Sequence, residues 1–278
     1  MNGIIISIDP VIVHLGQLEL RWYGLAIMMA VVAGILITAH RGKKRGIATE
    51  DIYSLALWLV LGGIIGARLF HVIEYWGYYI SDLLQRWPFQ QGGLPIWGAL
   101  VWQFQGLAIW GALVGGGVAA LAFARLKHIP AGRLFDVMVP GLLVAQMIGR
   151  LGCIVNGDAA GGVTSLPWAF IYTHPDAFIP ASLFGQPTHP YPVYEIIWNG
   201  LALLFILRLG RNFKKDGLLF LSYLSLYALA RFFLTFVRQE KIWFWGLQEA
   251  QVVALLVLLF SLVAMIYISR RRVPEEVA

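Results

Sequence analysis

The chain has 278 residues, of which 59% are hydrophobic and only 13% are charged, and its mean hydropathy is +0.72. Soluble globular domains carry about 25% charged residues, so this composition excludes a soluble protein and indicates an integral membrane protein. The formal net charge of +6 could suggest a nucleic-acid partner. We expect none, because the basic residues flank apolar runs and are explained by membrane topology.

Seven apolar runs are long enough to cross a membrane, since a helix needs about 20 residues to span about 30 Å of hydrocarbon. They cover residues 20–38, 55–73, 107–123, 135–155, 193–207, 218–236 and 247–268. The runs lack the alternating polarity of barrel strands. The sequence therefore predicts an all-α integral membrane protein with seven transmembrane helices. Without an internal repeat or a soluble segment, it predicts a single polytopic membrane domain over 1–278.

The placement of Lys and Arg predicts the orientation, because cytoplasmic loops carry an excess of both. Fourteen of the 21 basic residues follow the first, third, fifth and seventh runs. The N-terminus is therefore expected outside the cytoplasm and the C-terminus inside it. Residues 1–9 have no basic region, so we expect no cleaved signal peptide.

Two longer segments separate the runs. Residues 74–105 are rich in Trp, Tyr and Gln, a composition typical of amphipathic segments at the membrane interface. Residues 157–192 contain six prolines and lie on the predicted extracytoplasmic side. Because proline disrupts helix interiors, we expect a loop region without a long helix there.

The most informative segment is 149–162, where Arg150 lies about five residues before the end of the fourth apolar run and Asn156 and Asp158 come just after it. An ionisable group at membrane depth costs about 2.5 to 3.5 kcal/mol on insertion scales and usually marks a functional site. The glycines of this segment favour a re-entering turn over a continuing helix.

Arg231 lies at a similar depth in the sixth run. Two guanidinium groups that meet among helices suit a phosphate, and a phospholipid headgroup is the abundant anion in a membrane. As an alternative, Asp158 or Glu195 could neutralise the arginines structurally. Three further arginines could instead reach the interface with their charged ends: Arg21, Arg68 and Arg238.

Other residue types add less specific signals. Tyr227 lies four residues before Arg231 and therefore on the same helical face. The glycines of the third run are expected to allow close helix packing: Gly111, Gly115, Gly116 and Gly117. The single cysteine, Cys153, excludes an intrachain disulfide, and the six histidines show no ligand spacing, so no metal is expected.

Taken in order, these segments resemble the prolipoprotein diacylglyceryl transferase family over nearly the whole chain. The resemblance is carried by residues 8–12, 21–25, 66–68, 106–111 and 149–162, by His189 and Pro190 with Tyr194 and Glu195, by Tyr227 with 231–233, and by Gly246 and Leu247 with Ala250 and Gln251. The segment 149–162 together with seven spans is a specific signal for this family, whereas the short segments alone would be weak evidence for it.

The resemblance implies a seven-helix protein of the bacterial cytoplasmic (inner) membrane, with its active site toward the extracytoplasmic leaflet. The implied reaction transfers the diacylglyceryl group from phosphatidylglycerol to the lipobox cysteine thiol of a prolipoprotein signal peptide. A thioether forms, glycerol 1-phosphate is released, and no cofactor is implied. Two alternatives use the same buried arginines: a membrane transporter, or a noncatalytic lipid-binding protein.

The family positions assign roles to residues of this chain. The expected catalytic residues are Arg150, Arg231, Tyr227 and Asp158. The expected phosphatidylglycerol-binding residues are Arg150, Asn156, Gly161, Tyr23, Arg231, His189, Trp110 and Gly111.

Four departures from the family pattern bear on the mechanism. Cys153 replaces a common Asn, Asp158 replaces Glu, Trp110 falls on the histidine often proposed as base, and Thr235 falls on a glutamate. Asp158, His189 or Tyr227 could therefore accept the thiol proton. Alternatively, no dedicated base is needed, because a thiol with a pKa of about 8.5 is already partly ionised.

Overall fold

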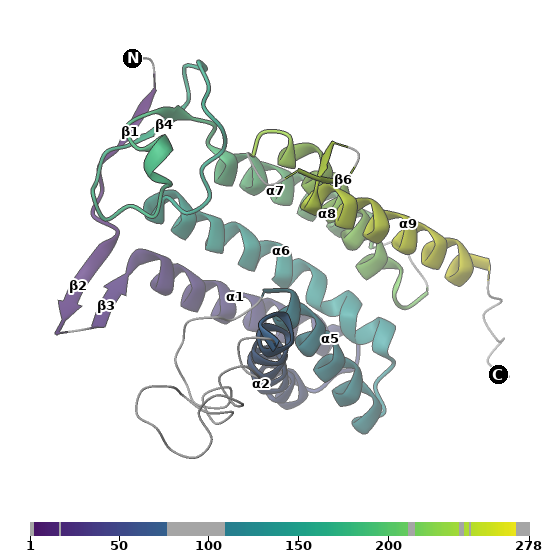
Figure 1. The fold of residues 1–278 in the computed structure, drawn as a ribbon. Helices are drawn as coiled ribbons and strands as arrows, with labels where there is room; N and C mark the ends of the chain where they lie inside the picture. Colours follow the sequence, from purple (N-terminus) through teal and green to yellow (C-terminus); the bar gives the residue numbers. More distant parts are fainter. Residues whose placement is uncertain are drawn as a thin grey trace, which may run out of the picture. The chain divides into compact units, whose positions relative to one another are not determined.

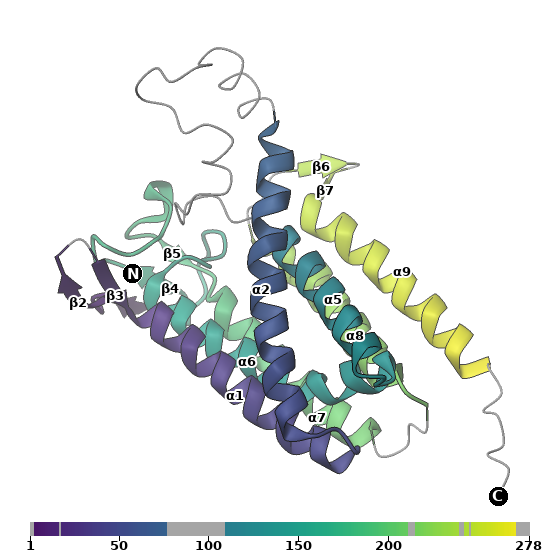
Figure 2. The same cartoon turned by 90° about the horizontal axis from the view of Figure 1, so that it is seen from below.

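The computed structural model describes residues 3–16, 18–76, 109–210, 215–238, 242–244 and 246–270, and this part is mostly helical (Figures 1 and 2). The helices are α1 (Trp22–Lys44), α2 (Thr49–Glu74), α5 (Ile109–Leu126), α6 (Ala131–Asn156), α7 (Tyr191–Leu209), α8 (Leu218–Thr235), α9 (Glu249–Arg270) and the short 3-10 helix η1 (Ala181–Leu183). The strands are β1 (Ile4–Ile6), β2 (Val11–Leu15), β3 (Leu18–Arg21), β4 (Phe170–Tyr172), β5 (Pro187–Thr188), β6 (Ile242–Phe244) and β7 (Leu247–Gln248).

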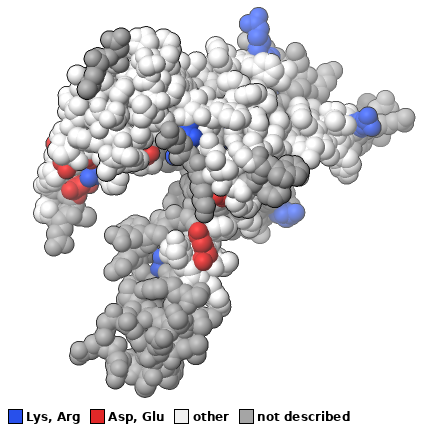
Figure 3. Space-filling view, turned by 45° about the horizontal axis from the view of Figure 1, so that its top comes forward, with Lys and Arg blue, Asp and Glu red and all other residues white. Residues whose placement is uncertain are grey.

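Six helices of the described ranges are long and apolar enough to cross a membrane: α1, α2, α6, α7, α8 and α9. This confirms the predicted class, an all-α membrane protein. The predicted third span corresponds to α5, whose apolar part is shorter, over Trp110–Leu126; residues 107 and 108 lie outside the described residues. Charged side chains are sparse on the surface seen in Figure 3, as expected for helices that face hydrocarbon.

The predicted turn over 149–162 is wrong in its first half, because α6 continues to Asn156. Its glycines serve packing instead. A Cβ added at Gly152 would lie 2.7 Å from the Ala26 Cβ and 3.2 Å from the Tyr23 Cα of α1. The chain leaves the helix only at Gly157, whose φ of 82° favours glycine.

The chain divides into two compact units, residues 1–45 with 132–278 and residues 46–131. In the first unit, α1 and α6 lie side by side where Gly34 meets Gly141 (Figure 1). Its helical core joins α6, α7 and α8 through Val139, Leu143, Ala202, Ile206, Leu219 and Tyr223. The expectation of one membrane domain over 1–278 stays a prediction.

A small sheet lies where α6 ends. β1 pairs with β4 in parallel, and β4 pairs with β5 in antiparallel orientation. The Tyr172 hydroxyl at the end of β4 donates a hydrogen bond to the Ile154 carbonyl over 3.1 Å, which ties the sheet to the last turn of α6. Between α6 and α7 the described chain forms β4, η1 and β5. Of the predicted interfacial segment 74–105, residues 77–105 lie outside the described residues.

The second unit is built on close contact between α2 and α5, which lie side by side in both ribbon views (Figures 1 and 2). A Cβ at Gly111 would overlap the Gly66 carbonyl, and one at Gly115 would overlap the Gly62 carbonyl. The expected packing role is therefore confirmed for Gly111 and Gly115. It is wrong for Gly117, where an added Cβ would meet no atom of another described element within 4 Å.

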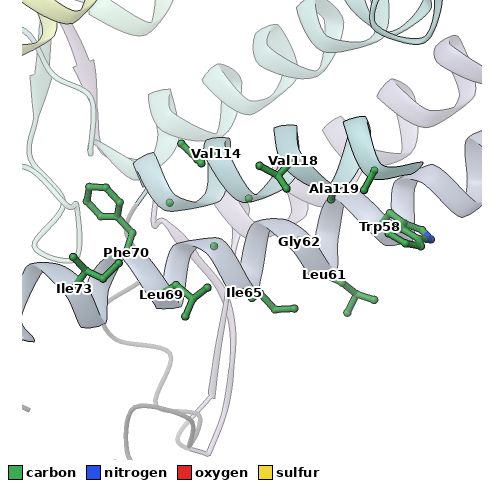
Figure 4. A pocket seen from close by; sticks show the side chains of 14 residues that line it. Trp58, Leu61, Gly62, Ile65, Leu69, Phe70, Ile73, Val114, Val118 and Ala119 are labelled. Atoms are coloured by element: carbon green, nitrogen blue, oxygen red, sulfur yellow. The ribbon is translucent and has the colours of Figure 1, made fainter. Parts of the chain in front are cut away.

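Apolar side chains of both helices surround a groove of about 680 Å³ along this pair (Figure 4). The labelled residues include Leu61, Ile65 and Leu69 of α2 and Val114 and Val118 of α5. Such a lining suits hydrocarbon and offers no charged group to a headgroup.

Candidate functional site

Three charged side chains from three helices meet in the first unit. Arg150 comes from the last turns of α6, Glu195 from the first turns of α7 and Arg231 from the last turns of α8. The Arg150 Nε pairs with Glu195 Oε2, and the Arg231 Nη1 lies 3.9 Å from Glu195 Oε1. Glu195 is buried. One carboxylate is thus shared by two arginines, each through a different oxygen.

Tyr191 completes this group. It is fully buried, and its hydroxyl accepts a hydrogen bond from Arg231 Nη1 over 2.8 Å. Its ring centroid lies 6.0 Å from the Arg150 Cζ and 5.3 Å from the Arg238 Cζ, distances at which cations are attracted to aromatic faces. We call Arg150, Arg231, Arg238, Tyr191 and Glu195 the arginine cluster. Within it, three positive charges meet one negative charge.

Cys153 and Asp158 extend the cluster beyond the end of α6. The Arg150 Nη1 donates to the Cys153 Sγ over 3.6 Å, and this sulfur lies 3.9 Å from Asp158 Oδ2. Cys153 is buried together with Ala159 and Tyr191, and Tyr23 packs against them. Of the two carboxylates considered as partners for the arginines, Glu195 pairs with both, whereas exposed Asp158 faces the thiol.

Asn156, the last residue of α6, is buried, and its side-chain oxygen accepts no hydrogen bond from the described residues. Its backbone carbonyl accepts one from the Phe178 N–H over 2.8 Å, which fixes the residue in place. An unsatisfied buried acceptor costs about 1 to 3 kcal/mol, so this oxygen is suited to receive a donor from a ligand.

Gly161 and His189 are joined through their backbones. The Gly161 N–H donates to the His189 carbonyl over 3.0 Å, the His189 N–H donates to the Gly162 carbonyl over 2.9 Å, and the Gly162 N–H donates to the Val237 carbonyl over 2.8 Å. A Cβ at Gly161 would lie 2.7 Å from the His189 Cβ, so the close approach requires glycine.

The His189 side chain is part of a polar group at the start of α7. Its Nδ1 lies 3.3 Å from the Tyr194 hydroxyl, which also accepts a hydrogen bond from Trp168 Nε1 over 3.2 Å. Burial lowers the pKa of His189, which favours the neutral imidazole at neutral pH.

Three further expected site residues are not members of the arginine cluster: Tyr227, Trp110 and Gly111. Tyr227 is 39% exposed, and its ring contacts Tyr223, with 6.2 Å between centroids. Trp110 and Gly111 belong to the second unit, where Trp110 is exposed and Gly111 packs on Gly66. Arg21, which could have been purely interfacial, pairs with Glu19 at 2.8 Å and lies over the Phe178 ring.

Sequence reasoning missed Tyr191, although a signal was present. Tyr191 and Glu195 are four residues apart, which places both side chains on one face at the first turns of a helix. Two arginines expected at membrane depth need such partners. The Thr235 position is also structural here, because its hydroxyl donates to the Arg231 carbonyl and its own carbonyl accepts from Gln248 Nε2.

Asp9, His174 and Asp176 form another polar group, with ligand-type atoms within 4.8 Å of one another. Local turn contacts account for it. An Asp9 carboxylate oxygen accepts from the Val11 N–H over 2.8 Å, and His174 Nδ1 accepts from the Asp176 N–H over 3.3 Å. The expectation that no metal binds stays a prediction.

Comparison with known proteins places this chain in a family. The family model for prolipoprotein diacylglyceryl transferase matches residues 10–267. A phosphatidylglycerol–prolipoprotein diacylglyceryl transferase of Nostoc sp. is 33% identical over 98% of this chain and 94% of its own length. Proteins of the same name from Clostridioides difficile (30% identical; 95% of this chain, 96% of the relative) and Synechococcus elongatus (35%; 98% and 92%) are similar over comparable lengths.

Proposed function

Because the chain belongs to the prolipoprotein diacylglyceryl transferase family, we propose that it transfers the diacylglyceryl group of phosphatidylglycerol to the lipobox cysteine of a prolipoprotein. A C–S bond forms, the C–O bond to phosphate breaks, and glycerol 1-phosphate leaves with the electron pair. The observation that carries the proposal is the meeting of Arg150 and Arg231, from α6 and α8, on one shared anionic partner.

The proposed topology has seven spans, with α5 as the additional one, and an extracytoplasmic N-terminus in the bacterial inner membrane. The last turns of α1, α7 and α9 carry basic residues, as cytoplasmic ends do. The arginine cluster lies at the opposite ends of these helices. The segment 157–192 would then be an extracytoplasmic loop, and the site would face the outer leaflet.

In this proposal the headgroup phosphate binds between Arg150 and Arg231, because a planar guanidinium can donate two hydrogen bonds to one phosphate. The buried, unpartnered oxygen of Asn156 would accept a hydrogen bond from a headgroup hydroxyl. Tyr23, Gly161 and His189 would shape the wall next to it. Lipid contacts by Trp110 and Gly111 rest on the family resemblance alone.

The arginines would act mainly on the leaving group. A phosphodiester carries one negative charge, whereas the released monoester approaches two because its second pKa is about 6. Interactions that strengthen as charge develops lower the barrier of the reaction. Arg150 and Arg231 would therefore stabilise the transition state more than the bound lipid.

The nucleophile would be the thiol of the protein substrate, since Cys153 is buried. At a pKa of about 8.5, about 3% of that thiol is ionised at pH 7. The positive cluster would raise this fraction, so we propose that no dedicated base is required. Asp158, His189 and Tyr227 are the groups that could otherwise accept the proton.

The test uses the purified full chain in phosphatidylglycerol liposomes with a synthetic lipobox peptide. We expect a peptide product with the added mass of one diacylglyceryl group, and an equal amount of glycerol 1-phosphate. A peptide with Ser in place of Cys, and liposomes without phosphatidylglycerol, are the controls. A folded protein that forms no thioether under varied lipid conditions would refute the transferase function and leave a lipid-binding or transport role.

A further inference from the structure

We propose that Glu195 is an exchangeable counter-anion of the lipid site. In the lipid-free protein it holds Arg150 and Arg231, it yields them to the headgroup phosphate when phospholipid binds, and it returns to help expel the glycerol phosphate product. This role rests on the proposed function, and it concerns affinity and product release rather than bond making.

The contacts of Glu195 suit exchange. Its two oxygens pair with two different arginine side chains, and among the hydrogen bonds of the described residues none comes to it from a backbone N–H. Guanidinium groups at the ends of flexible side chains can turn toward another anion without any change in the helices. A carboxylate bound by backbone groups could not be replaced in this way.

The arginines have contacts that would keep them in place once Glu195 moves away. The Arg231 Nη1, which lies 3.9 Å from Glu195, also donates to the Tyr191 hydroxyl over 2.8 Å. Arg150 additionally contacts the Cys153 sulfur at 3.6 Å and lies over the Tyr191 ring. These partners position both cations and carry no negative charge themselves.

The Glu195 carboxylate would affect both the stability of the lipid-free protein and the affinity of the site for anions. Buried cations without a partner are strongly destabilising, so the lipid-free protein needs a counter-charge at this position. The same counter-charge competes with every incoming anion and weakens its binding. The monoester product carries more negative charge than the diester substrate, so without a competitor the arginines would hold the product more tightly. A returning carboxylate therefore favours release.

The first experiment compares Glu195→Gln with the wild-type protein. Glutamine keeps the side-chain volume and removes the charge. We expect the inhibition constant of glycerol 1-phosphate to fall about tenfold, because Glu195 no longer competes with the phosphate for the arginines. A tenfold change corresponds to about one charge-assisted hydrogen bond. Maximal turnover should fall because product leaves more slowly. The matched control is Asp136→Asn, which removes the other buried carboxylate of α6–α8 and should leave this constant unchanged.

The outcomes separate the two proposals. Wild-type protein without thioether formation would refute the proposed function, while calorimetric titration with glycerol 1-phosphate would still test Glu195. If the wild type is active and Glu195→Gln binds glycerol 1-phosphate equally or more weakly, Glu195 is a fixed structural partner and the exchange proposal is overturned.

A second measurement needs no substitution, in case Glu195→Gln does not fold. A carboxylate that has lost its arginine partners is more open to reaction with a membrane-soluble carbodiimide than one that the arginines hold. In wild-type protein, glycerol 1-phosphate should accelerate labelling of Glu195 severalfold, as read by mass spectrometry. Asp136 in the same sample serves as the internal control. Labelling of Glu195 that is unchanged or slowed by glycerol 1-phosphate would contradict the exchange.

Discussion

Asp136 and Glu195 are two buried carboxylates of the same helical unit, and they are held in opposite ways. Asp136, near the start of α6, accepts hydrogen bonds from the Gly217 and Phe220 N–H groups, both over 2.8 Å. These are N–H groups that the first turn of α8 cannot satisfy within the helix, so α6 supplies the cap of α8. Glu195 is instead held by arginine side chains.

The difference distinguishes a fixed structural contact, at Asp136, from a proposed binding site, at Glu195. Backbone donors are fixed by the helix that carries them, so Asp136 makes a connection that no ligand can replace. The partners of Glu195 can turn to another anion. The bundle is thereby fastened at the Asp136 end, while the arginine cluster at the other end forms the proposed binding end. Substitutions at the arginine cluster should lower turnover and leave stability unchanged, whereas substitution of Asp136 should lower stability and leave turnover nearly unchanged.

The largest effect is expected for Arg150→Lys. An ammonium keeps the charge but cannot donate two parallel hydrogen bonds to a phosphate. We expect turnover to fall about 100-fold or more, the range seen when one transition-state donor is lost, while the protein still inserts and keeps its melting temperature. Arg21→Lys, outside the cluster, is the control. Wild-type turnover in Arg150→Lys would remove the proposed role at the leaving group.

Asp136→Asn should show the reverse pattern. The amide leaves one backbone N–H of α8 without an acceptor, at a cost of about 1 to 3 kcal/mol in the free energy of unfolding. Thermal unfolding in detergent should report this loss, while turnover well below the melting temperature stays within about twofold. If Asp136→Asn instead lost turnover at unchanged stability, Asp136 would not have the purely structural role that distinguishes it from Glu195.

A smaller effect concerns His189 at the edge of the binding end. Burial lowers its pKa, so below the ordinary value of about 6.5 the unfolded form binds protons more readily than the folded form. The stability contributed by neutral His189 is present above that pH and lost as the pH falls. Amide exchange at Gly161 and Gly162, corrected for intrinsic rates, should be modestly faster at about pH 5.5 than at about pH 7.5.

The comparison for this prediction is His189→Gln, which cannot titrate. Its corrected exchange rates at Gly161 and Gly162 should not change between the two pH values. Equal pH dependence in both proteins would assign the effect to another group.

The smallest effect is expected for Cys153→Ser and Cys153→Asn. The sulfur contacts Arg150 and Asp158, but a buried thiol is usually inert, and the reacting thiol is expected from the substrate. Turnover should stay within about threefold of wild type in the peptide assay. A drop beyond 100-fold at normal stability would place Cys153 in the chemistry and extend the binding end to include it.

Sequence patterns were sufficient to locate the membrane helices and to expect Arg150 and Arg231 in one place, because charges at membrane depth need a common partner. They were insufficient to choose that partner. The sequence of α7 is apolar on most sides of the helix, so it does not predict which face of α7 contacts the arginines. Only the packing of the helices shows that Glu195, and not Asp158, is their partner. The glycines before the end of α6 were misjudged similarly as signals of a turn, since Gly152 is explained by packing against Ala26 and Tyr23 on α1.

The glycines of α5 illustrate the same limit. A Cβ at Gly115 would overlap the backbone of α2, whereas one at Gly117, two residues later, would meet no other element of the described chain within 4 Å. A run of small residues predicts that a close contact exists. Only the rotation of the helix decides which of them makes it.

Gly161 and Gly162 are attached by main-chain hydrogen bonds, to His189 before α7 and to Val237 after α8. Such bonds need no particular side chain on either partner, apart from the space that glycine leaves at position 161. The loop around these glycines should therefore be exchangeable between related proteins. The corresponding segment of the Nostoc relative, a protein 33% identical to this chain, could use the same main-chain attachments and would bring its own side chains to the proposed lipid site.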